Sequence, residues 1–583
     1  MHALTRRLAF VTLALVAASH VGRSFSSGSG VGFRYGFNSG LRAETARPAS
    51  RVALVPLDDR PVSLQDPVML GAIAGAEIVT PPRGILGRYL KTGDGDSVAR
   101  WLDGLDVTAL DGVVVATDML AYGGLIGSRV PRVFEADARR RLEAIGRLKA
   151  RRVDLPVYAF STIMRLAPTS DGGNEPWREK VARWAEISPR ASADPAIAAE
   201  VTEIQSTLPA GMLDRYRAAR ARNLALNLSL VELAAQGTLD FLVFGQDDAR
   251  PAGVHVADRE AIARAIAAAR VEARTALQAG ADELASLLVA RAQLTKPAYQ
   301  PRVHVTYSSA ASRGAVMPFE DRPLADTVTA QVSTAGAEVA PTPAAATLRL
   351  FVYTSRHEAP DLSDSFAGEI AKALAAGARV AVADIDTKGD VQGSSLPFTE
   401  ALRTRKLLPR LSGYASWNTA GNTVGLALSQ GLLFAFGADR VASQGAEAAR
   451  AVGSAQIRML VHRIANDFLY QGVVRGQATE DFVKPRGLNA TRLDDSGRAR
   501  VEKYLVGELR PLVDSVLSDF GSEAWRLPAA PGKRSMAALS VKDLERFELT
   551  LPWSRMFEAE MVIDVRIVPA AAEPRPPRPR ILR

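Results

Sequence analysis

Aspartate residues stand at the ends of several apolar segments of this chain, where carboxyl groups are able to act as acids, bases or nucleophiles. In a parallel β-sheet, ligands bind at the carboxyl ends of the strands, so an aspartate just past a buried strand lies on the floor of a pocket. Partial burial there shifts its pKa. For a single aspartate, capping of the next helix or a turn is the simpler interpretation, but four such segments in one chain favour a shared site. The residues are Asp58 and Asp59 after VALVPL, Asp118 after VVVAT, Asp247 and Asp248 after FLVFGQ, and Asp384 and Asp386 in VAVADID.

Pairs of carboxyl groups carry out glycoside hydrolysis, in which one protonates the leaving oxygen and the other acts as base, nucleophile or orienting group. The adjacent Asp247 and Asp248 resemble the carboxylate pair of the substrate-assisted N-acetylhexosaminidases. By that analogy, Asp247 orients the substrate and Asp248 is the general acid. Asp118 is a third catalytic candidate, and a pairing with Asp58 or Asp59 stays open. The leading interpretation is therefore a glycosidase that acts on a sugar or an amino sugar.

Other polar and aromatic residues are expected on the same rim, because they follow the same segments or lie in the turn-rich stretch YASWNTAGNT. An indole plane beside amide and carboxylate groups suits a polyhydroxylated ligand, since one face of the ring is apolar and the neighbouring groups form hydrogen bonds. Packing of Trp417 in the core is the competing interpretation. The residues expected to bind substrate are Asp58, Asp59, Arg60, Tyr122, Arg129, Arg165, Trp417, Asn418 and Asn422.

Two other classes of function remain open. A metal-assisted hydrolase would hold a hard cation such as Mg²⁺ or Ca²⁺ with carboxylate oxygens, Asp384 included, although no residue is assigned as a metal ligand and the cofactor is unknown. A non-enzymatic sugar- or solute-binding protein would need the aromatic and arginine residues but no carboxylic acid with a shifted pKa. Nucleic acid is not expected as a partner, because the net charge of +9 comes from interspersed Lys, Arg, Asp and Glu residues. The expected partner is a small-molecule or oligosaccharide substrate.

Short apolar strands that alternate with helical patterns must position these aspartates. Strands are expected at 52–57, 112–117 and 241–244, among others, and helices at 136–150 and 258–292. This alternation predicts an α/β fold with a parallel sheet covered by helices. About eight strands in roughly 340 residues favour a (β/α)8-type barrel over two doubly wound domains.

The N-terminus has the architecture of a secretory signal. Arg6 and Arg7 precede an apolar run at residues 8–18 that is too short to span a bilayer. We therefore expect an exported protein, periplasmic or extracellular, with no stable membrane insertion after signal removal. The chain has no cysteine, which excludes disulfides and a cysteine nucleophile. The expected regions are a signal peptide (1–22), a flexible spacer (23–50), a parallel α/β domain (51–410) with a helical insert (about 176–236), a mainly helical C-terminal region with a short β segment (411–569) and a disordered tail (570–583).

Five segments form an ordered set of motifs along the chain: VPLDDRPV, TDMLAYGGLIGSR, GQDDARPAG, YASWNTAGNTVG and LPWSRMFE. Together they resemble a bacterial family catalogued as a domain of unknown function, DUF4127. The similarity runs from about residue 51 to residue 569, nearly the whole mature chain. Because the family name carries no established activity, the resemblance supports the choice of motifs and implies no particular chemistry.

Overall fold

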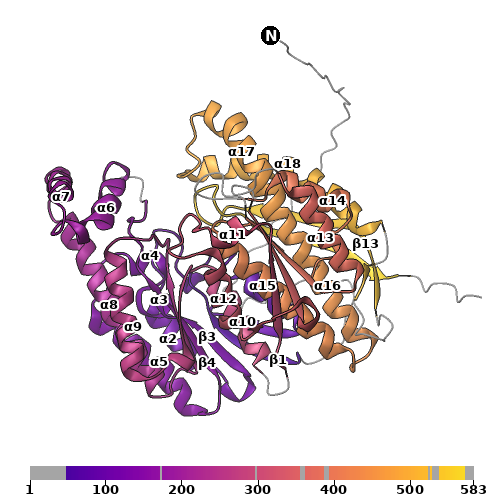
Figure 1. The fold of residues 1–583 in the computed structure, drawn as a ribbon, viewed down its shortest axis with the longest axis horizontal. Helices are drawn as coiled ribbons and strands as arrows, with labels where there is room; N and C mark the ends of the chain where they lie inside the picture. Colours follow the sequence, from indigo (N-terminus) through magenta and orange to yellow (C-terminus); the bar gives the residue numbers. More distant parts are fainter. Residues whose placement is uncertain are drawn as a thin grey trace, which may run out of the picture. The chain divides into compact units, whose positions relative to one another are not determined.

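Two parallel β-sheets with helices packed on their faces form the framework of this computed structural model (Figure 1). The α/β class predicted from the sequence is confirmed. The structure describes residues 48–170, 174–295, 299–354, 361–385, 393–522, 525–527 and 537–570. The predicted signal peptide, most of the predicted spacer, Asp386 and the predicted tail beyond Ala570 lie outside the described residues.

The first sheet has the strand order β2-β1-β3-β4-β5-β6, and all of its neighbouring strands are parallel. This is a doubly wound order, in which the chain changes direction across the sheet between β1 and β3; ligands bind at such switch points. The strands are β1 (Ser50–Val55), β2 (Ala76–Val79), β3 (Gly112–Ala116), β4 (Val157–Ile163), β5 (Phe241–Gln246) and β6 (Thr275–Ala279). The accompanying helices are α1 (Gln65–Ile73), α2 (Gly95–Asp103), α3 (Thr117–Tyr122), α4 (Leu125–Ser128), α5 (Glu135–Arg151) and α9 (Val254–Ala269).

The second sheet has the order β11-β10-β9-β7-β8 and is also parallel. Its first strand lies between its second and third strands, as in the first sheet, so both sheets wind in the same order. The strands are β7 (Arg302–Tyr307), β8 (Glu338–Val339), β9 (Leu348–Thr354), β10 (Val380–Ile385) and β11 (Gly413–Ala415). The helices are α11 (Ala310–Gly314), α12 (Leu324–Thr334), α13 (Ser363–Ala375) and α14 (Leu396–Thr404).

The expected (β/α)8-type barrel is wrong, because the strands form two open sheets instead of one closed cylinder. Two buried helices explain the difference: α10 (Leu284–Leu294) packs on β3 and β4 of the first sheet, and α15 (Ala420–Val441) packs on β10 and β11 of the second. These helices also pack on each other. Helices that are apolar on nearly all sides must be enclosed, and here they fill the layer between the sheets.

The prediction of one helix at 258–292 is also wrong, because β6 lies between α9 and α10 in this range. The sequence of β6, TALQA, lacks the run of β-branched residues that marks the other strands. β6 is paired on one side only, with β5. A short edge strand of this kind leaves little periodic signal in the sequence.

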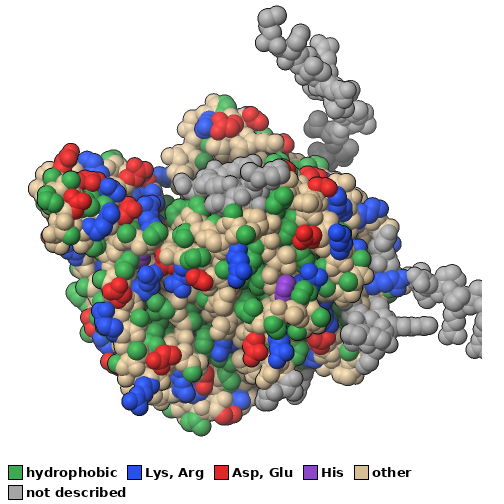
Figure 2. Space-filling view, in the orientation of Figure 1, with side chains coloured by type: hydrophobic (Ala, Val, Ile, Leu, Met, Phe, Trp, Pro, Cys, Tyr) green, Lys and Arg blue, Asp and Glu red, His purple; other side chains and the backbone are tan. Residues whose placement is uncertain are grey.

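The helical insert expected at about 176–236 consists of α6 (Glu175–Ile187), α7 (Pro195–Thr207) and α8 (Met212–Ala235). It has a small apolar core of its own, centred on Trp184 and Tyr216. In Figure 2 the α6–α7 region at the left carries acidic and basic side chains side by side. Across the described residues, none of the helices combines the length and the apolar character that crossing a membrane requires.

The C-terminal part is helical and ends in an antiparallel sheet of three strands. The boundary expected at residue 410 falls inside the second sheet, because β11 follows it. The segment 551–559, called the hairpin segment below, joins β13 to β14. The elements after α15 are α16 (Ala446–Arg463), a π-helical stretch (Ile464–Val474), α17 (Arg475–Ala478), α18 (Asp495–Gly521), β12 (Trp525–Arg526), β13 (Ala538–Thr550) and β14 (Glu560–Pro569).

Candidate functional site

Six aspartates follow the carboxyl ends of strands in the first sheet, and we call this set the strand-end rim. Those after β1 and β3 flank the switch point of the sheet, where the fold favours ligand binding. Five members were predicted from the sequence, and the sixth follows β6, the strand that was missed. The rim consists of Asp58, Asp59, Asp118, Asp247, Asp248 and Asp282.

Arg60 joins two of these carboxylates. Its guanidinium donates to Asp58 through Nε and Nη2, at 2.9 and 2.7 Å from Oδ2. The same Nη2 donates to Asp282 Oδ1 at 2.6 Å, so the two carboxylates lie on opposite sides of one nitrogen. All three side chains are buried, and a buried charge is stable only when it is paired. Arg60 was expected to bind substrate; in this structure it holds the rim together.

Asp59 accepts a hydrogen bond from a residue near the C-terminal end of the chain. The indole Nε1 of Trp553, in the hairpin segment, donates to Asp59 Oδ1 at 2.8 Å. Burial raises the pKa of Asp59, and the hydrogen bond from Trp553 opposes the change. The guanidinium of Arg60 stacks on the Trp553 ring at 4.9 Å, and Glu558 lies 4.0 Å from Arg60 Nη1. The hairpin segment therefore closes directly over the rim.

Asp118 is fully buried at the start of α3. It accepts hydrogen bonds from the Thr162 backbone N at 2.9 Å and hydroxyl at 2.8 Å. Burial raises the pKa of Asp118 to about 6; the Thr162 hydrogen bonds oppose this change and the neighbouring Asp247 adds to it. Tyr122, at the end of the same helix, is also buried, and the Arg222 guanidinium covers its ring at 4.1 Å. Both side chains are inaccessible here, so their predicted catalytic and substrate-binding roles gain no support from this geometry.

Asp247 and Asp248 each pair with an arginine that the sequence analysis had selected. Arg129 donates to Asp247 at 2.5 Å, and Arg165 donates to Asp248 at 2.5 Å. The side chain of Asp247 is 7% exposed and that of Asp248 is 31% exposed. Asp248 has a φ of 38°, which is uncommon for a residue other than glycine and typical of functional turns. The structure thus brings these four residues together at the end of β5.

The two adjacent carboxyls have opposite pKa shifts. Burial raises the pKa of Asp247, with Arg129 opposing the change. Burial also acts to raise the pKa of Asp248, but the positive charges of Arg165 and Arg129 outweigh this effect, so the pKa of Asp248 is lowered. The pairing with Arg165 favours the ionised form of Asp248, which argues against the general-acid role that the sequence analogy gave it. Of the two, Asp247 is the one that burial favours in the protonated form.

The turn that leads into α15, and the first turn of that helix, carry the three remaining predicted substrate-binding residues. These are Trp417, Asn418 and Asn422. Asn418 donates to Asn422 at 2.6 Å, and Asn422 donates to the buried Glu283 at 2.6 Å. Glu283 follows Asp282 in the chain, so this network adjoins the rim. The Trp417 ring packs on Phe557 of the hairpin segment at 5.9 Å.

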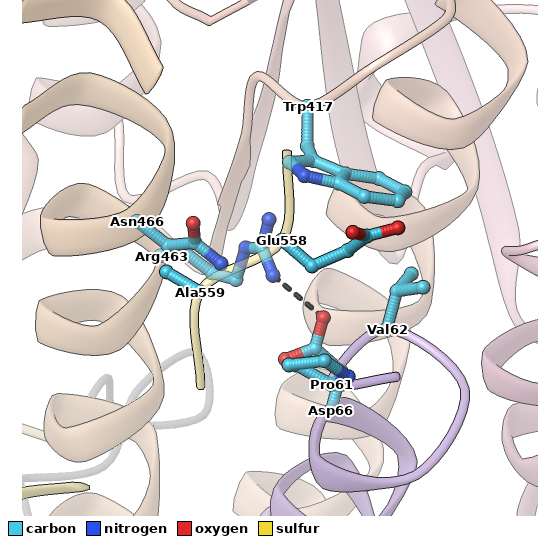
Figure 3. A pocket seen from close by; sticks show the side chains of 8 residues that line it. All are labelled: Pro61, Val62, Asp66, Trp417, Arg463, Asn466, Glu558 and Ala559. Carbon is cyan, nitrogen blue, oxygen red and sulfur yellow. Dashed lines mark hydrogen bonds and ion pairs between the residues drawn. The ribbon is translucent and has the colours of Figure 1, made fainter. Parts of the chain in front are cut away.

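Two small pockets lie beside the hairpin segment. The first, called the indole pocket, encloses about 220 Å³ including space open to solvent, and Figure 3 shows the side chains that line it. The second, called the glycine pocket, encloses about 170 Å³ on the same basis, at the β1/β3 switch point. The residues that line the indole pocket include Asp66, Trp417, Arg463, Asn466 and Glu558. Those that line the glycine pocket include Asp58, Tyr89, Gly123, Gly124 and Trp553.

Hard cations such as Mg²⁺ and Ca²⁺ are bound by several oxygen ligands that converge on one point. Asp384 lies at the end of β10 in the second sheet and accepts from Thr399 at 2.7 Å and from Tyr414 at 3.2 Å. No group of three or more His, Asp or Glu side chains in the described ranges is arranged to hold a metal ion. The rim carboxylates instead face guanidinium, hydroxyl and indole donors.

The sequence matches a family model described as a protein of unknown function (DUF4127) over residues 52–562. The chain belongs to this family. The match includes every residue of the strand-end rim and the hairpin segment. A search of curated proteins finds no match.

Among solved structures, the chain is similar to an endo-fucoidan hydrolase from glycoside hydrolase family 107. The identity is 11% and the TM-score is 0.17. The alignment covers 50% of this chain and 48% of that one, about half of each. A likeness at this TM-score does not establish a shared fold or a shared activity.

Proposed function

We propose that this DUF4127 member is a hydrolase that cleaves glycosidic bonds with Asp247 and Asp248. The contrast between these two neighbours supports the proposal most strongly: Asp247 is buried beside Arg129, whereas Asp248 is partly exposed and pairs with Arg165. Two titratable groups whose surroundings push their pKa values apart are the usual basis for separate acid and base roles in one site. Their position at the carboxyl end of a parallel strand agrees with this assignment.

In the proposed reaction, Asp247 donates a proton to the glycosidic oxygen as the bond to the anomeric carbon breaks. Asp248, ionised and partly exposed, supplies the negative charge that either attacks that carbon or activates water. Arg165 and Arg129 keep Asp248 ionised. Asp118 acts as a positioning residue, because Thr162 occupies its oxygens and its charge faces Asp247.

A sugar substrate suits the rim because carboxylates accept hydrogen bonds from hydroxyl groups and guanidinium groups donate to them. The half-buried ring of Tyr89, whose centroid lies 5.3 Å from that of the buried Trp553, adds an apolar surface at the glycine pocket next to the rim. Polar groups that fix orientation beside apolar surface are the usual composition of a small-molecule site.

A panel of aryl glycosides, with and without EDTA, tests the proposal. The wild-type chain should release the aryl alcohol from at least one substrate, and Asp248→Asn should abolish most of that activity. Asp103→Asn is the matched control, because Asp103 lies at the end of α2, away from the rim, and forms an exposed ion pair with Arg147 of α5. Loss of activity with EDTA would favour the metal-assisted alternative. Saturable sugar binding without turnover would favour the non-enzymatic binding protein.

A further inference from the structure

We propose that Arg178 binds an anionic group of the substrate, either a carboxylate or a sulfate ester, beside the bond that Asp247 and Asp248 cleave. This assignment rests on the hydrolase function above and narrows the substrate class to acidic sugars. Arg178 lies in the first turn of α6, within the helical insert, and was not selected from the sequence.

Asp248 is the member of the strand-end rim with the most exposed side chain. It is 31% exposed, whereas none of the other five members exceeds 10%. A substrate therefore approaches the two catalytic carboxyls from the side on which Asp248 is exposed. Side chains next to Asp248 on that side contact the substrate first, so they determine which substrates are accepted.

Arg165 places Arg178 close to Asp248. Arg165 donates to Asp248 through Nη1 at 2.5 Å and to the Pro168 carbonyl through Nη2 at 3.5 Å. Arg178 Nε donates to the same carbonyl oxygen at 3.0 Å, so the two guanidinium groups meet at one backbone oxygen in the loop after β4. Burial and the charge of Arg165 lower the pKa of Arg178, whereas the charge of Asp248 opposes this change.

The half-buried guanidinium of Arg178 has no carboxylate partner among the described residues. Arg129 and Arg165 pair with Asp247 and Asp248, one arginine to each carboxylate. Arg178 donates to an acceptor through Nε alone within the described ranges. Its terminal nitrogens Nη1 and Nη2 are therefore available to a ligand at the exposed side of Asp248.

Two acidic residues on α6 lie near Arg178 in the sequence but leave it available. Glu175 accepts a hydrogen bond from the Ser170 hydroxyl, and Glu179 is exposed. Their charges act on the pKa of Arg178 less than the charge of Asp248 does. Neither forms an ion pair with Arg178 in the part of the chain that the structure describes.

An oxyanion suits this arrangement better than a neutral hydroxyl does. Arg165 and Arg178 carry like charges in a partly desolvated place, and a negative group beside them offsets their repulsion. A guanidinium presents parallel N–H donors that match the oxygens of a carboxylate or a tetrahedral oxyanion. An acidic sugar combines such a group with the hydroxyls that the rim binds.

Binding of methyl glycosides to the full chain, measured by ligand-observed NMR, tests the anion site. The probes are methyl glucuronide for a carboxylate, methyl glucoside 6-sulfate for a sulfate ester, and methyl glucoside as the neutral counterpart. Arg178→Gln removes the charge, and Arg178→Lys keeps the charge without the planar fork. Arg190→Gln is the matched control, because Arg190 is an exposed arginine just beyond the other end of α6.

At least one anionic probe should bind the wild type saturably, and methyl glucoside should bind about tenfold more weakly or not at all. The anionic probe that binds more tightly identifies the group. Arg178→Gln should weaken that probe about tenfold or more, Arg178→Lys should weaken it less, and Arg190→Gln should leave it unchanged. Equal binding of the charged and neutral probes to the wild type would overturn the anion site, even if a variant failed to fold. Equal effects of Arg178→Gln and Arg190→Gln would also overturn it.

Kinetics separate the anion site from the hydrolase function. On an acidic aryl glycoside, Arg178→Gln should raise KM about tenfold with a smaller effect on kcat. Asp248→Asn should still bind the anionic probe, so binding without any hydrolysis by the wild type would overturn the catalytic proposal alone. Hydrolysis of neutral and acidic aryl glycosides with the same KM, in the wild type and in Arg178→Gln, would overturn the anion site alone.

Discussion

The carboxyl groups of Glu283 and Glu320 flank Gly421 at the first turn of α15. A Cβ atom on Gly421 would lie 2.8 Å from Glu320 Oε1 and 3.7 Å from Glu283 Oε1. Glu283 accepts hydrogen bonds from Asn422 and Gln331, and Glu320 accepts from Gly421 N. Burial raises the pKa of Glu283 to about 8 and that of Glu320 to about 7. Two close carboxyls in a buried site cannot both ionise cheaply, so the pair retains a proton near neutral pH.

This pair makes stability depend on pH. In the unfolded chain Glu283 ionises near pH 4.5, whereas in the fold it keeps its proton to about pH 8. Between these values unfolding releases a proton, so the free energy of unfolding should fall as pH rises and then level off. The loss should be on the order of 2 kcal/mol or more. Urea unfolding of the wild type and Glu283→Gln between pH 5 and 9 checks this, because the variant should give a flatter profile. An equally steep profile in Glu283→Gln would contradict it, and Glu143→Gln, at an exposed position on α5, is the control.

Arg60→Gln should destabilise the fold strongly. The substitution leaves Asp58 and Asp282 buried without their shared cation, and removing one partner of a buried ion pair costs about 3–5 kcal/mol. Urea unfolding at pH 7 measures the change. Arg147→Gln should cost less than about 1 kcal/mol, because the Arg147–Asp103 pair is exposed. Similar losses for the two variants would show that Arg60 is not needed to hold the rim.

Asp247→Asn and Asp248→Asn should respond differently to the leaving group. If Asp247 is the acid, its variant should lose about 10²–10⁴-fold in kcat on an unactivated glycoside and much less on a nitrophenyl glycoside. Asp248→Asn should lose activity on both, because an activated leaving group does not replace a nucleophile or base. Steady-state kinetics on the two substrates make the comparison. The opposite pattern would restore the order first suggested by analogy, with Asp248 as the acid.

Trp553→Phe should cost about 1–3 kcal/mol, because it leaves the buried Asp59 without its indole donor. The aromatic surface under Arg60 remains in this variant. Thermal unfolding gives the change in stability, and Trp177→Phe on α6 provides a control outside the rim. An unchanged melting temperature in Trp553→Phe would mean that the hairpin segment is not fastened through this hydrogen bond.

Export is a proposal that rests on the N-terminal signal pattern. The mature chain should begin near residue 23, after removal of the apolar run. Mass spectrometry of the protein recovered outside the cytoplasm checks the cleavage site. Recovery of the intact chain with Met1 would contradict it.

The parts of the fold that the sequence predicted are those with strong local signals. β1, β3 and β5 are continuous apolar runs, and the aspartates that follow them meet at one rim as expected. The pairing of β7 with β9 and β8 is not visible in any periodicity, because it depends on which edge each strand joins; hence two sheets were mistaken for a barrel. Asp282 was not predicted as a member of the rim, because it follows β6, a strand that the sequence pattern did not reveal. The roles that we propose for Asp247 and Asp248 differ from the order given by the sequence analogy, because they depend on Arg129 and Arg165, which lie far away in the sequence.

The bond between Asp59 and Trp553 also has a consequence for how the chain is made. The two residues are 494 positions apart. Asp59 therefore leaves the ribosome long before Trp553 is made, and the indole that covers it is added only when synthesis is almost complete. A chain interrupted before residue 551 would lack the whole hairpin segment, so its Asp59 would have no indole donor.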